Sequence, residues 1–165
     1  MTQEELYHPI PQPGDLNQQV KEDAMGSYFM MFATMALGLP LPILNLIAAI
    51  IYYYLNRAKD RFVRFHAMQS LLSQIPLSIL NGIAVVWGVY LIVNNLSINN
   101  DLIAYLIFLG VVNILYVIFS LIAAVRARKG LFYYFLFFGK YAFHNAYLKR
   151  ASDNASEDSP NKPPF

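Results

Sequence analysis

Three long uncharged stretches dominate the pattern of hydrophobic and polar positions along this chain. They cover residues 27–55, 71–93 and 102–125 and contain 29, 23 and 24 residues. The hydrocarbon core of a bilayer is about 30 Å thick, and a helix that rises about 1.5 Å per residue crosses it in roughly 20 residues. Helices in the core of soluble proteins seldom stay uncharged over such lengths. The pattern therefore predicts an all-α, polytopic helical membrane protein with three transmembrane helices.

A proline-rich break interrupts the first stretch at Gly38, Pro40 and Pro42. Proline removes a backbone donor and bends or ends a helix. Two arrangements are compatible with this break. In one, a single kinked helix crosses the membrane; in the other, residues 28–37 enter as a half-helix and residues 42–55 form the main span. The two arrangements place the N-terminus on opposite sides of the membrane.

The segments outside these spans are more polar or more aromatic. Residues 1–26 form a polar arm that we expect to be disordered or loosely attached, and residues 151–165 form a disordered tail. Residues 130–150 combine the aromatic run LFYYFLFF with nearby cations, which predicts an interfacial or shallow re-entrant helix. A fourth span over residues 131–148 is the alternative. One membrane domain, residues 27–150, thus lies between two polar ends.

Lysine and arginine are distributed unevenly around the spans. The loop after the first span contains Arg57, Lys59, Arg61 and Arg64, whereas the asparagine-rich residues 94–101 contain no lysine or arginine. Cytoplasmic loops of membrane proteins carry an excess of lysine and arginine. We therefore expect the basic segments to face the cytoplasm and the protein to lie in the bacterial inner membrane.

These cations and two neighbouring ring side chains are candidates for docking anionic lipids or a partner protein. They occupy the first loop and the segment after the third span: Arg57, Lys59, Arg61, Arg64, Phe65, His66, Arg126, Arg128 and Lys129. The other interpretation is that they only orient the spans. The expected partners are anionic lipids of the inner leaflet and other integral membrane proteins, and a homo-oligomer is compatible with the sequence. The net charge of +2 does not indicate nucleic acid binding.

A second group of polar side chains lies in or beside the spans at helical spacing. This polar stripe comprises Asn45, Ser70, Gln74, Ser78, Asn81, Asn113 and Ser120. Polar groups within a bilayer face other helices, so we expect the stripe to join the spans through hydrogen bonds. The alternative is a polar path for an ion or small solute.

No set of residues predicts catalysis, a cofactor or a metal site. The chain has no cysteine, and His8, His66 and His144 lie in different segments without paired ligand spacing. The three spans contain no aspartate, glutamate, lysine or arginine. The sequence therefore predicts a non-enzymatic protein without a cofactor.

Two sequence motifs flank the second and third spans. The run KDRFVRFHAMQSLLSQI at residues 59–75 is similar to the signature of the Tic-twenty-like membrane family, and LIAAVRARKGLFYYF at residues 121–135 resembles its closing motif. That family joins the small subunit of the chloroplast inner-envelope translocon to MamF-like proteins and uncharacterised bacterial relatives. The resemblance covers residues 28–138. It implies a helical membrane fold, a role in protein import for the plastid member, and no catalytic residues.

Taken together, these features favour an accessory or scaffold subunit of a membrane protein complex, linked to protein translocation or envelope assembly. The reason is that polar and basic side chains gather at one interface and not along the spans. Two alternatives belong to other functional classes. One is a homo-oligomeric transporter or channel for an ion or small solute, and the other is a lipid or stress sensor whose partner binding depends on anionic lipid.

Overall fold

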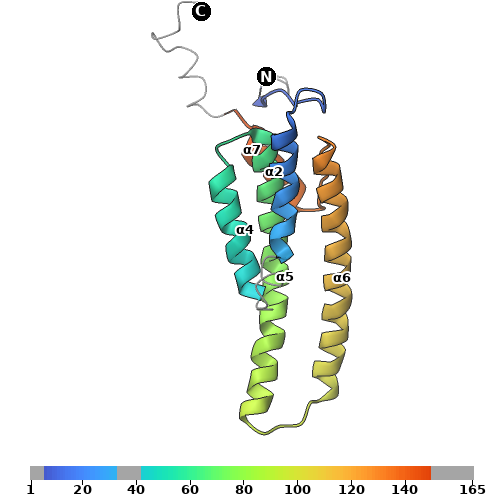
Figure 1. Ribbon diagram of the computed structural model, residues 1–165. Helices are drawn as coiled ribbons and strands as arrows, with labels where there is room; N and C mark the ends of the chain where they lie inside the picture. Colours follow the sequence, from blue (N-terminus) through green and yellow to red (C-terminus); the bar gives the residue numbers. More distant parts are fainter. Residues whose placement is uncertain (1–5, 33–41, 150–165) are drawn as a thin grey trace, which may run out of the picture.

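A long helical hairpin, with shorter helices packed against one of its ends, forms the protein (Figure 1). The structure is a computed structural model and describes residues 6–32 and 42–149. Within these residues the elements are α2 (Gln18–Phe29), η1 (Met30–Phe32), α4 (Pro42–Asn56), α5 (Arg61–Val93), α6 (Asn100–Arg128) and α7 (Phe138–Tyr147). The break at Gly38 and Pro40 and the tail at residues 151–165 lie outside the described residues.

Helices α5 and α6 form the hairpin, and each contains one of the predicted spans. They have 33 and 29 residues, or roughly 50 Å and 43 Å, which exceeds the thickness of the hydrocarbon core. Both are long and apolar enough to cross a membrane. In the most apolar stretch of each helix only 11% and 17% of the residues are buried, whereas the core helix of a soluble protein is mostly buried. The exposed apolar faces of the hairpin are therefore suited to contact with lipid.

Local sequence signals set the ends of the two long helices. The side chains of Asp60 and Asn99 accept hydrogen bonds from the backbone N–H groups of Phe62 and Leu102, at 2.7 and 3.0 Å, and so cap α5 and α6. Beyond the last turn of α6, Gly130 has a φ of 74°, in the left-handed region that glycine adopts without strain. The chain turns sharply there, which brings the following aromatic segment back over α5.

In the described part of the chain, the first predicted span, residues 27–55, contains only the end of α2, then η1 and α4, and α4 runs antiparallel to α2 (Figure 1). The Tyr52 hydroxyl on α4 donates to the backbone oxygen of Asp23 on α2 at 2.6 Å, and Lys59 Nζ lies 3.2 Å from an Asp23 carboxylate oxygen. Residues 23 and 52 are 29 positions apart, so one continuous helix would separate them by about 43 Å. The single kinked helix is therefore wrong. The start of α2 and the end of α4 lie at the same end of the hairpin (Figure 1).

Helix α4 is shorter than the hydrocarbon core of a bilayer. It has 15 residues, or about 22 Å, against about 30 Å of hydrocarbon. Helix α2 has 12 residues and η1 has three. Together they have as many residues as α4 and are also too short to cross the hydrocarbon core. Both run beside only part of the long hairpin (Figure 1). Two helices in the described part of the chain, and not the three predicted, are long enough to cross.

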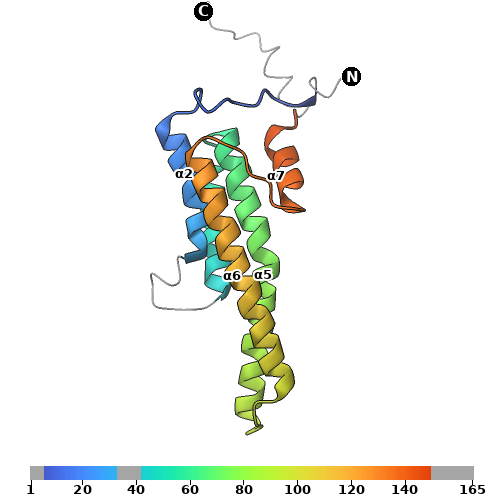
Figure 2. The ribbon, with the colours of Figure 1, turned by 90° about the vertical axis from the view of Figure 1, so that its right-hand side faces the viewer.

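The buried core lies where the shorter helices cover the hairpin. The buried residues of α5 fall between Phe62 and Gln74, apart from Leu91. One hydrophobic cluster surrounds Phe62 and joins α2, α5 and α6, and a second surrounds Phe65 and Ala142 and joins α5 and α7. In the other half of the hairpin α5 and α6 run as a pair that no other described helix covers (Figure 2).

The N-terminal segment is more ordered than the sequence predicts. Residues 6–17 cross the end of the bundle and reach the segment that follows α7 (Figure 2). The backbone N–H of His8 donates to Tyr147 O, and the backbone N–H of Lys149 donates to Leu6 O, both at 2.9 Å. Pairing with a segment near the other end of the sequence orders this arm, and no local pattern predicts such pairing.

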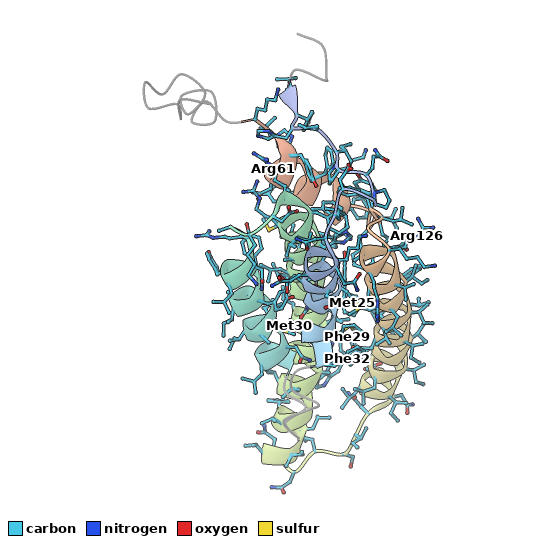
Figure 3. The ribbon with its side chains drawn as sticks, turned by 45° about the horizontal axis from the view of Figure 1, so that its top comes forward. Met25, Phe29, Met30, Phe32, Arg61 and Arg126 are labelled. Atoms are coloured by element: carbon cyan, nitrogen blue, oxygen red, sulfur yellow. The ribbon has the colours of Figure 1, made fainter. Side chains whose placement is uncertain are left out.

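The aromatic segment after α6 is helical only in its second part. Residues 131–137 form no helix, and α7 has 10 residues, or about 15 Å. Helix α7 packs against α5 at the end of the bundle that carries Arg61 and Arg126 (Figure 3). The fourth span over residues 131–148 is therefore wrong, because α7 is too short to cross.

The antiparallel arrangement links the sides on which three exposed positions lie. Because the chain has no cysteine, the single variants Gly14→Cys, Ala58→Cys and Ser97→Cys can be labelled without background. We expect residues 14 and 58 to react alike and residue 97 oppositely when a membrane-impermeant maleimide is added to intact cells and to inside-out vesicles. Labelling of residues 14 and 58 from opposite sides would contradict the pairing of α2 with α4.

Candidate functional site

All the lysine and arginine residues in the described part of the chain lie at one end of the bundle, which we call the basic end (Figure 1). These ten cations are Lys21, Arg57, Lys59, Arg61, Arg64, Arg126, Arg128, Lys129, Lys140 and Lys149. The described carboxylates at this end are Asp15, Glu22, Asp23 and Asp60. The described part of the basic end therefore carries an excess of positive charge, whereas Asp101 at the start of α6 lies at the opposite end.

A cleft of about 530 Å³ opens among these cations. The N-terminal segment, the loop before α5 with the first turn of α5, and the end of α7 form its walls, which include Pro9, Pro11, Arg57, Lys59, Arg61 and Arg64. Three segments that are distant in the sequence thus build one positively charged cavity. The sequence predicted the cations, but the contribution of the N-terminal segment follows only from the tertiary structure.

Neighbouring groups hold two of the cleft arginines in place. Arg64 is half-buried, and its Nη2 donates to Ala146 O at 2.6 Å. Arg61 is exposed, and its Nη2 lies 3.1 Å from His8 Nε2. A guanidinium has five N–H donors in a fixed plane. Arg61 can therefore keep its contact with His8 and still present donors to an anion.

Two of the predicted docking residues, Phe65 and His66, do not lie on the surface. Both are 0% exposed. Phe65 packs in a cluster with Ala142 and Tyr147 of α7, and the His66 ring centre lies 4.5 Å from that of Phe62. The reason is that α2, α7 and the aromatic segment enclose the first turns of α5. Assigning these two side chains to a docking surface is therefore wrong.

A buried chain of hydrogen bonds links α2 to α5. Gln69 Nε2 donates to the Tyr28 hydroxyl oxygen at 2.9 Å, and that hydroxyl lies 2.8 Å from His66 Nδ1. The Tyr28 hydroxyl therefore contacts both Gln69 and His66, and the tautomer of His66 sets which group donates in the second contact. His66 thus makes a structural hydrogen bond. Within residues 6–32 and 42–149, no three or more His, Cys, Asp or Glu side chains form a group that could hold a metal ion.

Gln69 also holds the non-helical part of the aromatic segment. Its Oε1 accepts from the backbone N–H of Phe135 at 3.1 Å, and its Nε2 donates to Tyr133 O at 2.8 Å. The side-chain amide thereby pairs with this backbone as a neighbouring strand would. A Cβ at Gly139 would lie 2.8 Å from Tyr134 Cβ and 3.0 Å from Gln69 Oε1. Glycine at this position therefore lets α7 approach the aromatic segment that Gln69 holds.

Gln69 is not among the candidate residues that the sequence predicts. A signal was present, because Gln69 follows His66 by three residues and precedes Ser73 by four, which places all three on one helix face. What the pattern does not contain is the partner of the amide. Tyr133 and Phe135 are more than 60 residues away, so only the tertiary structure brings them together.

The polar stripe forms separate contacts between helices. Ser70 Oγ donates to Ser27 O on α2 at 2.8 Å, and Gln74 Nε2 donates to Ser70 Oγ at 3.3 Å. The Asn81 and Asn113 side chains exchange hydrogen bonds between α5 and α6, both at 3.3 Å. Residues 70 and 81 are separated by about 16 Å along α5. These contacts therefore hold helices together at different levels of the bundle.

The other three members of the stripe lie on three different helices. Asn45 on α4 and Ser78 on α5 are half-buried, and Ser120 on α6 is 1% exposed. The structure thus distributes the seven stripe residues over α4, α5 and α6 and does not bring them to one site.

Gln69→Leu should destabilise the protein more than Gln74→Leu. The two glutamines lie on the same helix and are 0% and 2% exposed, so the changes are matched in type and place. Gln69→Leu removes three hydrogen bonds and leaves backbone groups of the aromatic segment unpaired. We expect it to lower the unfolding free energy by about 3 kcal/mol, and Gln74→Leu to lower it by about 1 kcal/mol. Denaturant unfolding in detergent micelles, followed by circular dichroism, measures both; equal losses would contradict the role of Gln69.

Comparison with known proteins identifies the family. The profile of the MamF/MmsF family, described as the magnetosome magnetite crystal formation protein family, matches residues 24–141. This match covers well over half of the chain and includes α4, α5, α6 and the second half of α2. No curated protein and no solved structure matches the chain. The family match and the two long apolar helices together show that the chain belongs to the MamF/MmsF family and is a small helical membrane protein.

Proposed function

We propose that this chain is a non-enzymatic scaffold or accessory subunit that holds a partner protein at the membrane surface through its basic end. The observation that carries the proposal is the positive charge of that end, which has ten cations and only four carboxylates among the described residues. Such a surface fits a partner that presents acidic side chains, because complementary charge steers association and selects partners. Anionic lipids would add about 1 kcal/mol for each cation close to the bilayer surface.

The α6 side of the basic end offers the most accessible docking surface. Arg126, Arg128 and Lys129 are exposed. The Arg126 guanidinium lies 5.6 Å from the centre of the Tyr133 ring, a cation–π contact that restrains it. The aromatic segment that carries Tyr133 is in turn held by Gln69. These cations therefore project from a fixed part of the structure, which supports a docking role.

The proposal places the protein in the bacterial inner membrane with its basic end in the cytoplasm. Residues 94–99, between α5 and α6, contain no lysine or arginine, so the bias that orients membrane proteins favours this direction. The family description concerns magnetite crystal formation in magnetosomes. In a cell that forms magnetosomes, the scaffold would serve that process by holding a partner at the membrane. The proposed link to protein translocation or envelope assembly rests on the resemblance of residues 59–75 and 121–135 to the motifs of the Tic-twenty-like family.

The hydrogen bonds of the polar stripe support a scaffold over a transporter or channel. Gln74 bonds to Ser70, and Asn81 bonds to Asn113, within the same chain. Side chains that line a solute path keep polar atoms available to the solute. A lipid or stress sensor would use the same basic end as the scaffold, and its mark would be partner binding that requires anionic lipid.

Replacing Arg126, Arg128 and Lys129 by glutamine should weaken the binding of the partner. We expect the native chain, cross-linked in cells and purified in mild detergent, to carry a stoichiometric partner with an acidic surface, as measured by size and mass spectrometry. The triple variant should capture it about tenfold less, which corresponds to about 1.4 kcal/mol. Added salt should have the same effect on the native chain, because it screens exposed charges.

Gln74→Leu combined with Asn81→Leu is the matched control, because it changes the stripe and leaves every cation in place. This variant should keep the partner. A native chain that remains partner-free in several detergents and in nanodiscs would contradict the scaffold. Solute flux in reconstituted vesicles that this double variant abolishes would favour the transporter.

A further inference from the structure

The cleft at the basic end has the charge of an anion site. Its charged lining residues are Arg57, Lys59, Arg61, Arg64 and Asp60. The Asp60 carboxylate caps α5 by accepting from the Phe62 N–H at 2.7 Å. The Lys59 ammonium lies 3.2 Å from the Asp23 carboxylate. Lys59 is paired with Asp23, and Asp60 accepts the hydrogen bond that caps α5. The three arginines therefore give the cleft its excess of positive charge.

A buried hydroxyl adds a neutral donor beside these arginines. Tyr147 lines the cleft and is 1% exposed, and its hydroxyl has no hydrogen-bond partner among the described residues. Asp60, Arg61 and Arg64 line the same cleft as Tyr147. Burial raises the pKa of Tyr147 above its ordinary value, so the group keeps its proton at neutral pH. A buried donor without an acceptor is costly, and a ligand oxygen in the cleft would satisfy it.

An exposed apolar stripe on α4 leads to the same cleft. Ile47, Ile51 and Leu55 follow one another at intervals of four residues and are 44%, 53% and 70% exposed. The guanidinium of Arg57 lies over the ring of Tyr54, 4.5 Å from its centre. A molecule whose apolar part lies along this stripe would have its polar end at Arg57. Free phosphate would make no use of the stripe, so the arrangement favours an amphiphile.

We propose that the cleft binds the phosphate group of an anionic phospholipid, whose acyl chains lie along α4. Arg57 and Arg61 donate charge-assisted hydrogen bonds to the phosphate oxygens, and the Tyr147 hydroxyl donates another. Pro9 and Pro11 of the N-terminal segment also line the cleft, so one lipid would contact α4, α5, α7 and this segment together. The inference rests on the proposed function only in that the basic end lies at the membrane surface, and it requires no protein partner.

Lipid titration of the full chain in neutral detergent tests the ligand. The probes are dioleoylphosphatidylglycerol, the zwitterionic dioleoylphosphatidylcholine, and inorganic phosphate at the same concentration. We expect phosphatidylglycerol to appear as a bound species in native mass spectrometry and to raise the Tm, and the other two probes to do neither. Equal effects of inorganic phosphate would overturn the lipid as the source of the phosphate. Equal effects of phosphatidylcholine would overturn recognition of negative charge.

Matched variants test the location. Arg57→Gln with Arg61→Gln removes two cations from the cleft, and Arg126→Gln with Lys140→Gln removes two from the same end of the bundle but outside the cleft. We expect about a tenfold loss of affinity for phosphatidylglycerol in the first pair and less than about twofold in the second. Equal losses would mean that only the overall surface charge attracts the lipid, and would overturn the cleft.

Tyr147→Phe provides a test that keeps the packing, because the ring stays and only the hydroxyl is lost. It should weaken phosphatidylglycerol binding by about fivefold without a change in circular dichroism. Unchanged affinity in this variant would exclude the hydroxyl as a donor to the lipid. Arg128 and Lys129 remain in every variant of this series. The lipid proposal can therefore fail while the partner is still captured. Loss of partner capture with intact lipid binding would in turn contradict only the proposed function.

Discussion

The arrangement of the basic end depends on how one buried side-chain amide is paired. Residues 131–137 form no helix, and polar backbone groups in apolar surroundings need partners. Gln69 supplies them by pairing with Tyr133 and Phe135. The same amide donates to Tyr28, which fixes α2 against α5. One residue thus joins two helices to the aromatic segment and sets the place at which α7 packs.

This concentration of contacts divides the molecule along its length. At the basic end four helices and the aromatic segment bury a core around α5, whereas α5 and α6 continue beyond it as a pair (Figure 2). Asn81 and Asn113 exchange hydrogen bonds within that pair. Lipid, or other apolar surfaces in the bilayer, is the medium in which the exposed side chains of the pair are stable. Packing at the basic end therefore fixes how the helices are arranged, and the exposed apolar side chains of α5 and α6 make the protein stable in a membrane.

Charge follows the same division. The cations of the described residues lie at the packed end, where neighbouring groups hold several of them, as with Arg64 against Ala146 O and Arg126 against Tyr133. Such cations lose less conformational entropy on binding than cations on mobile tails do. The proposed partner surface on the α6 side and the proposed lipid cleft beside Arg57 are two separate regions of this end. A scaffold that binds lipid at one region and protein at the other would be oriented by the membrane before it meets its partner.

The sequence by itself determined the helical class, the two long spans and the gathering of cations beside them, because hydrophobic length, helix caps at Asp60 and Asn99, and charge are local properties. It placed Phe65 and His66 on a surface and residues 27–55 in one span, because periodicity does not tell which neighbours cover a helix face. Only the tertiary structure decided three features. These are the antiparallel direction of α4, the attachment of residues 6–17 to the end of α7, and the hydrogen bonds of Gln69 to the aromatic segment. Each depends on hydrogen bonds between residues far apart in the chain, and such pairs leave no trace in a local pattern.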